Sequence, residues 1–118
     1  MRKSLLPMAV LLSLLMTTVA PSFAGETGIA GIHAWVRVGK KTCINKDHYH
    51  FGDGQAAKRS DAEKKAVENW EGFTAIDYGT DWMRYSLAES KKMTCEKSGS
   101  GWKCTAAARA CKISKRKK

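Results

Sequence analysis

The early part of the chain shows a polar–apolar alternation with a period of two. Residues 32–38 place apolar side chains at every second position and His33, Trp35 and Arg37 between them. This alternation predicts a strand. A second, weaker strand is expected over residues 42–51, and the sequence Gly-Asp-Gly at 52–54 favours a turn that ends it.

The clearest helical pattern begins at residue 60. Ser60 and Glu63 have the spacing of a capping box, in which each side chain bonds the backbone amide of the other. Apolar residues then recur at three- and four-residue steps and predict one buried stripe, made of Ala62, Ala66, Val67, Trp70, Phe73 and Ile76. Gly79 fits a left-handed C-terminal cap.

A second helix is expected directly after the first. Thr80 can cap it, and the apolar residues between Trp82 and Ala88 supply its buried side. After Lys92 the pattern changes again. Residues 93–97 and 102–111 read as the two arms of a hairpin, joined by the loop Ser-Gly-Ser-Gly at 98–101.

These elements together predict an α+β fold. A small antiparallel sheet of three or four strands would carry two consecutive helices on one face, in the order β-β-α-α-β-β. A single domain would occupy residues 25–111, and residues 112–118 would form a basic C-terminal tail.

The first 24 residues have the pattern of a secretory signal peptide. Arg2 and Lys3 precede an apolar run, and Ser22 and Ala24 place small residues where a signal peptidase reads them. The run is too short for a membrane span. We therefore expect cleavage near Ala24 and a mature protein in the periplasm or outside the cell.

Four cysteines in a small exported domain predict two disulfides that staple a thin core. In the expected hairpin Cys95 faces Cys104, which favours that bridge and leaves Cys43 to pair with Cys111. The two other pairings remain open. A zinc module is disfavoured, because 51, 8 and 6 residues separate successive cysteines.

The charge balance favours polyanionic partners. The chain has a formal charge of +10, and five cations crowd its last seven residues: Lys112, Lys115, Arg116, Lys117 and Lys118. Coulomb attraction and counterion release favour lipopolysaccharide, anionic lipid, acidic polysaccharide or extracellular DNA. Cytosolic nucleic acid would be out of reach after export. A solvated tail that only keeps the protein soluble is the alternative.

Two kinds of side chain are candidates for more specific contacts. Trp35 and Trp102 lie on expected strands, where an exposed ring can touch a partner or simply fill the core. His48 and His50 would project from one strand face about 7 Å apart, and imidazole suits copper, zinc or nickel. No third ligand is fixed by spacing, and His33 would approach only if the two early strands pair. We favour no metal and no cofactor.

Motifs of the common enzyme classes are missing: no nucleophile elbow, P-loop or dinucleotide fingerprint occurs in the sequence. The leading expectation is a non-enzymatic exported binding protein that uses a basic surface at the cell envelope. One alternative is an inhibitor or accessory protein that docks another periplasmic protein. Another is a metal-binding or hydrolytic protein centred on the histidines.

The order of several short motifs resembles a pattern in small exported proteins of unknown function from Gram-negative bacteria. In that pattern a proline often precedes the last cysteine, where this chain has an alanine. The resemblance implies no particular activity. Its pieces lie between residues 43 and 111 and comprise His-Tyr-His-Phe-Gly (48–52), Trp-Glu-Gly-Phe-Thr (70–74), Tyr78-Gly79, Trp82, Ala88, Lys91, Cys95, Trp102-Lys103-Cys104 and Ala110-Cys111.

Overall fold

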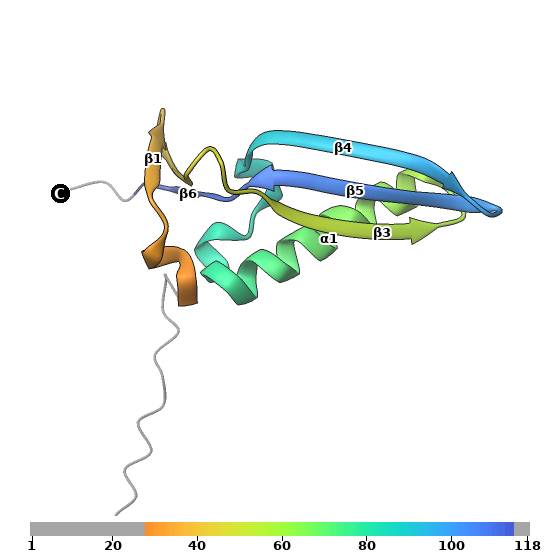
Figure 1. Ribbon diagram of the computed structural model, residues 1–118, viewed down its shortest axis with the longest axis horizontal. Coiled ribbons are helices and arrows are strands. Elements are labelled where there is room, and N and C mark those ends of the chain that lie inside the picture. Colours follow the sequence, from red (N-terminus) through yellow and green to blue (C-terminus); the bar gives the residue numbers. More distant parts are fainter. Residues whose placement is uncertain (1–27, 115–118) are drawn as a thin grey trace, which may run out of the picture.

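The computed structural model describes residues 28–114, which form one α-helix and six strands in two three-stranded antiparallel sheets (Figure 1). The predicted signal peptide and residues 115–118 lie outside the described residues. The elements are the 3-10 turn η1 (Gly28–Ile32), β1 (Trp35–Val38), β2 (Lys41–Ile44), β3 (His50–Ala56), α1 (Arg59–Tyr78), the 3-10 turns η2 (Thr80–Trp82) and η3 (Tyr85–Leu87), β4 (Glu89–Ser98), β5 (Gly101–Arg109) and β6 (Cys111–Ile113).

The larger sheet has the order β3-β5-β4, and α1 lies along one of its faces (Figure 1). The helix approaches β3 so closely that only glycine fits beneath it. A Cβ on Gly52 would lie 2.4 Å from the Ala66 carbonyl oxygen, and one on Gly54 would lie 2.3 Å from that of Ala62. The expectation of a turn at 52–54 was wrong, because these glycines make room for the helix inside a strand.

The buried stripe of α1 differs from the predicted one. Its buried residues follow steps of four, namely Ala62, Ala66, Trp70, Thr74 and Tyr78. Phe73 is 47% exposed and Ile76 is 83% exposed, so both were wrongly assigned to the core. Trp70 directs the packing, since its indole nitrogen donates to the carbonyls of His50 at 2.9 Å and Ala108 at 3.3 Å.

The start of α1 also corrects the sequence analysis. The helix begins at Arg59, and its N-cap residue Lys58 makes no side-chain capping bond. The capping box between Ser60 and Glu63 was therefore wrong. Glu63 instead pairs with the Arg59 guanidinium one turn earlier, at 3.1 Å, which is the favourable i,i+4 arrangement of opposite charges.

No second α-helix occurs among residues 28–114, so the expected pair of consecutive helices was wrong. The segment after Gly79 forms two single turns, η2 and η3, whose aromatic residues dock on neighbouring rings. Tyr85 lies 5.3 Å from Trp70, and Trp82 lies 5.4 Å from Trp35, between ring centroids. The chain then enters β4 at Glu89 and pairs with β5.

The hairpin at the end of the chain is present. Lys97 pairs with Trp102 and Cys95 with Cys104 across β4 and β5. Both disulfides join directly opposed residues: Cys95–Cys104 in the larger sheet and Cys43–Cys111 in the smaller one. The Cα separations of 4.1 and 4.0 Å are those of non-hydrogen-bonded antiparallel pairs.

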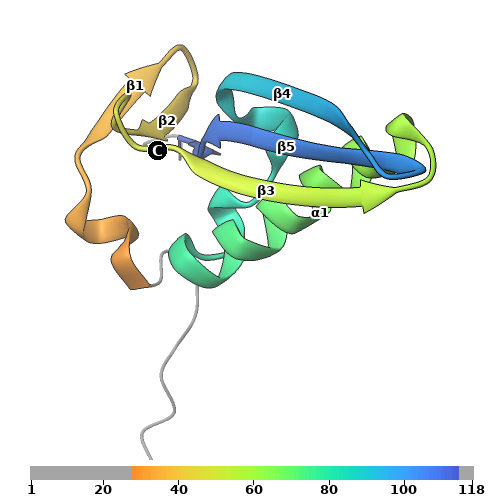
Figure 2. The same cartoon turned by 45° about the vertical axis from the view of Figure 1, so that its right-hand side comes forward.

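The smaller sheet has the order β1-β2-β6 and stands at one end of the larger sheet (Figure 2). The single strand expected over 42–51 is split between β2 and β3, with residues 45–49 as their connection. Residue Ala110 alone separates β5 from β6, and it accepts the Ile44 amide at 2.9 Å. Buried Arg109 adds two bonds to the Ile44 carbonyl. No described helix is long and apolar enough to cross a bilayer.

Candidate functional site

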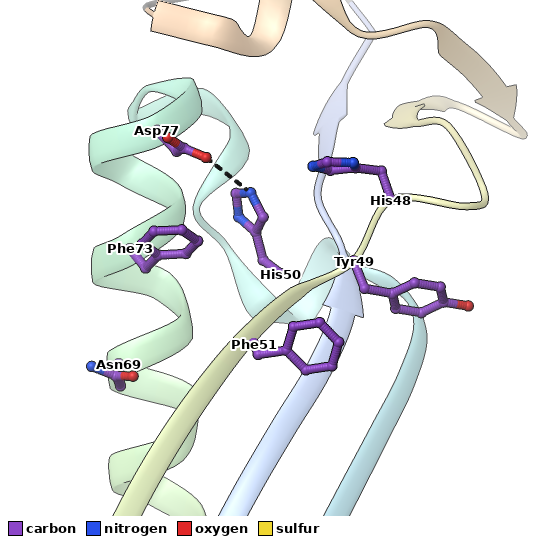
Figure 3. Close-up of a pocket in the computed structure, with 7 residues that line it drawn as sticks. All are labelled: His48, Tyr49, His50, Phe51, Asn69, Phe73 and Asp77. Carbon is purple, nitrogen blue, oxygen red and sulfur yellow. Dashed lines mark ion pairs between the residues drawn. The ribbon is translucent and has the colours of Figure 1, made fainter.

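A cleft of about 470 Å³ opens between the start of β3 and the second half of α1 (Figure 3). We call it the histidine cleft; it is lined by His48, Tyr49, His50, Phe51, Asn69, Phe73 and Asp77. Its volume lies in the range of small-molecule pockets. The helical residues Asn69, Phe73 and Asp77 follow one another at steps of four, so they form one wall that faces β3.

His50 forms the base of the cleft and is only 3% exposed. Its Nδ1 lies 2.9 Å from the Thr74 hydroxyl, and its ring stacks on Tyr78 with centroids 4.2 Å apart. Its Nε2 lies 3.2 Å from an Asp77 carboxylate oxygen, yet the atoms are not aligned as a hydrogen bond. Thr74, Tyr78 and Asp77 thus hold the ring in place.

Burial decides the protonation states in this region. Desolvation lowers the pKa of His50 to about 4, against the opposing attraction of Asp77. The imidazole is therefore neutral at pH 7. Burial likewise raises the pKa of Tyr78 to about 12, and nearby Asp77 adds to that rise, so the phenol keeps its proton. Asp77 has no lysine or arginine partner among the ion pairs of the described residues.

The chain's three histidines gather around this cleft. His33 lies 4.2 Å from His48, and His48 lies 6.1 Å from His50, between ring centroids. Their ligand atoms do not converge, however. Among the described residues, one group of three metal-capable side chains has converging ligand atoms, and it contains Glu63 and the disulfide-bonded Cys95 and Cys104. The arrangement as it stands favours no metal.

Two common catalytic roles do not suit the groups of this cleft. Thr74, the hydroxyl next to His50, is fully buried and cannot reach a substrate as a nucleophile. A base with a pKa near 4 is also poorly matched to proton abstraction at neutral pH. On its helix side the cleft offers one exposed aromatic ring, a neutral imidazole and a carboxylate. In Figure 3 the rings of Tyr49 and Phe51 both turn away from the helix, as the alternation of β3 requires when His50 and Gly52 face α1, so the ring wall is Phe73.

A second candidate surface lies at the smaller sheet, which we call the basic end. Its cations are Arg37, Lys40, Lys41, Lys46 and Lys112, and its exposed apolar residues are Ile29, Ile32, Trp35, Val36 and Ile113. Lys41 is paired with Glu89, whose pKa is lowered mainly by the hydrogen bond from that lysine. Charge is unevenly distributed over the described residues. The helix α1 contains five acidic and three basic residues, whereas the other described residues include five acidic and twelve basic ones.

The predicted basic tail begins at this end. Lys112 belongs to β6, and its ammonium lies over the rings of Trp35 at 4.5 Å and Trp82 at 5.0 Å. Ser114 donates its amide to the Lys40 carbonyl at 3.1 Å. Lys115, Arg116, Lys117 and Lys118, which follow Ser114, lie outside the described residues.

The two candidate contact tryptophans have different surroundings. Trp35 is partly exposed, and its indole nitrogen donates to the Ala30 carbonyl at 2.8 Å. Trp102 is flanked by two cations, Arg59 at 5.4 Å and Lys97 at 4.9 Å from its ring centroid. Trp102 therefore offers less free ring face to a partner than Trp35 does.

His48 and His50 were predicted as candidate residues from the sequence, but the residues on the other side of the cleft were not. Phe73 was assigned to the core, and Asn69, Thr74 and Asp77 were not singled out. One signal was present: Asn69, Phe73 and Asp77 repeat at steps of four, one position before the buried Trp70, Thr74 and Tyr78. That pattern describes a helix edge where a buried face meets solvent.

Comparison with known proteins gives no identification: no family model matches the chain, and no curated protein or solved structure shows significant similarity to it.

Proposed function

We propose that the protein is a non-enzymatic binding protein of the cell envelope, and that its basic end binds an anionic lipid surface. The observation that carries the proposal is the position of Ser114. Its amide bonds the Lys40 carbonyl, so the described chain ends beside the β1–β2 turn, close to Lys40 and Lys41. Arg37 on β1 and Lys112 on β6 add two further cations to the same small sheet.

The mixture of side chains supports a lipid surface over a purely charged polymer. Ile32, Val36 and Ile113 are exposed in the same region as the cations. Apolar side chains enter the boundary between headgroups and acyl chains, whereas cations beside them contact phosphate. Near an anionic membrane each lysine or arginine contributes about 1 kcal/mol. The predicted export and the two disulfides agree with an envelope location.

Vesicle co-sedimentation with purified protein tests the proposal. We expect binding to phosphatidylglycerol-containing vesicles, weakening as salt rises from 50 to 500 mM, and little binding to pure phosphatidylcholine, because counterion screening acts on the exposed charges. The variant R37E/K40E should weaken binding roughly 10-fold or more.

The matched control is K58E/K64E, which makes the same change of net charge near the start of α1, away from the basic end. It should bind within about threefold of the original protein, since screened charges act over roughly 10 Å. Equal loss in both variants, or equal binding to the two kinds of vesicle, would contradict a localised lipid-binding surface.

A further inference from the structure

The histidine cleft contains a carboxylate with no cationic partner. Asp77 is partly exposed at one end of the cleft, and it is paired with His50, whose neutral ring supplies no charge. A carboxylate on the wall of an apolar cleft favours a ligand that brings a positive charge. The helix around it adds to this preference, because α1 has two more acidic than basic residues in a protein that is otherwise basic.

A second observation also points to a ligand. The Nε2 atom of His50 is buried and makes no aligned hydrogen bond within the described part of the chain. Buried polar atoms normally have partners, because an unmade bond costs free energy. If the Nδ1 hydrogen is donated to Thr74, Nε2 presents a lone pair toward the cleft, 3.2 Å from an oxygen of Asp77. A donor with several N–H groups satisfies both acceptors.

The helix wall of the cleft matches the body of such a ligand. Phe73 is 47% exposed on the helix that faces β3, and its ring lies 4.7 Å from that of His50 (Figure 3). Large apolar side chains that remain exposed around one concavity are typical of a binding surface. Aromatic faces attract cations in addition to apolar groups.

We propose that the histidine cleft binds a primary organic ammonium with an apolar body, its nitrogen donating to His50 and Asp77 and its body lying against Phe73. This binding goes beyond the lipid-surface function and does not depend on it. A metal ion explains fewer of the observations, because the cleft lacks a converging third ligand and a metal needs no aromatic wall.

Isothermal titration of the purified protein with phenethylammonium tests the proposal. We expect saturable binding of one equivalent, and much weaker binding of phenethyl alcohol and phenylpropionate, which have similar bodies without the positive charge. D77N should lower the affinity about 10- to 100-fold, as expected for loss of a charged hydrogen-bond partner. F73A should lower it about threefold or more through the lost ring contact.

The matched control is E68Q, which removes one negative charge from the same helix at an exposed position that does not line the cleft. It should leave the affinity within about twofold. Amide NMR shifts upon titration should map to β3 and the facing part of α1. A second probe, Nα-acetyl-lysine methylamide, distinguishes the source of the ammonium: stronger binding of this probe indicates a lysine side chain of a partner protein.

Three results would overturn the proposal: equal binding of the alcohol, equal loss in E68Q and D77N, or displacement of the amine by stoichiometric zinc or copper that binds more tightly. Vesicle binding by D77N should stay unchanged. Failure of the amine titration therefore leaves the lipid-surface proposal standing, and failure of the vesicle experiment leaves the amine proposal standing.

Discussion

The two sheets of this protein are held together in different ways. In the larger sheet, backbone meets backbone: Gly52 and Gly54 let α1 lie directly on β3, and a layer of alanines continues the contact on β5. In the smaller sheet the strands have three or four residues each, and the Cys43–Cys111 bridge cross-links β2 to β6 within it. The bonds from Arg109 of β5 to the Ile44 carbonyl tie this sheet to the larger one.

This difference shows how a domain of this size divides its sources of stability. Close helix–sheet packing needs no large side chains, because dispersion contacts between tightly fitted atoms accumulate over the whole interface. A sheet of such short strands cannot do the same, so covalent and charged links replace packing there. We expect the larger sheet to respond most to changes of volume, and the smaller sheet to respond most to reduction.

The largest effect should come from G52A. The added methyl group would lie 2.4 Å from two backbone atoms of α1, which cannot move without shifting the helix. We expect the free energy of unfolding to fall by more than about 4 kcal/mol, measured by urea denaturation. A loss below about 1 kcal/mol would show that the helix is not seated on β3 as described.

The next largest effect should come from replacing the link of the smaller sheet. The bridge between Cys43 and Cys111 spans 68 residues, and the double variant C43S/C111S should lose about 4 kcal/mol by loop entropy. Hydrogen exchange should rise first at β1, β2 and β6. The control C95S/C104S opens a loop of only 9 residues and should lose about 2.5 kcal/mol. Equal exchange in both sheets of the first variant would contradict separate stabilisation.

A smaller loss of stability should occur at acidic pH, because His50 is buried against the larger sheet. Burial lowers the folded-state pKa of His50 from 6.5 to about 4. Asp77 opposes this shift, whereas His48 and His33 add to it. Between these pH values the unfolded chain binds the proton and the folded one does not. Stability should therefore fall by about 3 kcal/mol as the pH drops from 6.5 to 4, and this contribution should level off below 4.

The variant H50Q isolates that contribution. The unfolding free energies of H50Q and of the original protein are measured as a function of pH. Between pH 6.5 and 4 the curve of H50Q should be less steep, because it lacks the contribution of His50, whereas the carboxylates titrate in both proteins. Parallel curves for the two proteins between pH 6.5 and 4 would show that His50 is not buried in its neutral form.

The smallest effect concerns the side of α1 that faces away from the sheet. A Cβ on Gly72 would meet nothing within 4 Å, so G72A should raise the unfolding free energy by about 0.5–1 kcal/mol through higher helix propensity. Thermal denaturation measures this gain. G52A and G72A thus compare the same substitution at a glycine packed under α1 and at a glycine on the exposed side of α1. A fall in the unfolding free energy of G72A would show that Gly72 is in a packed contact.

The parts predicted well from the sequence are those fixed by neighbours in the chain. The short hairpin loop sets the register that brings Cys95 opposite Cys104; Ser98 and Gly101 pair as strand residues, so the loop has two residues and not the expected four, but the register is the same. The glycines at 52 and 54 were misread because glycine serves turns and close approaches equally, and only the position of α1 decides between them.

The predictions of a second helix and of a buried Phe73 were wrong for a related reason. The apolar positions between Trp82 and Ala88 fit either a helix or turns that dock aromatic rings, and contacts with Trp70 and Trp35 select the turns. Phe73 has the composition of a core residue, yet its exposure depends on where the edge strand β3 ends the sheet. Both outcomes depend on tertiary contacts that a local pattern does not encode.

The direct passage from β5 through Ala110 into β6 has a mechanical consequence. Tension applied beyond Ile113 enters β6, which is an edge strand of the smaller sheet and by its hydrogen bonds alone would peel away one bond at a time. The bridge from Cys111, its first residue, to Cys43 divides the load between β2 and β5, and β5 is the central strand of the larger sheet, where hydrogen bonds on both sides share the load. A molecule tethered by its C-terminal residues would therefore keep its helix seated while the tether is under strain.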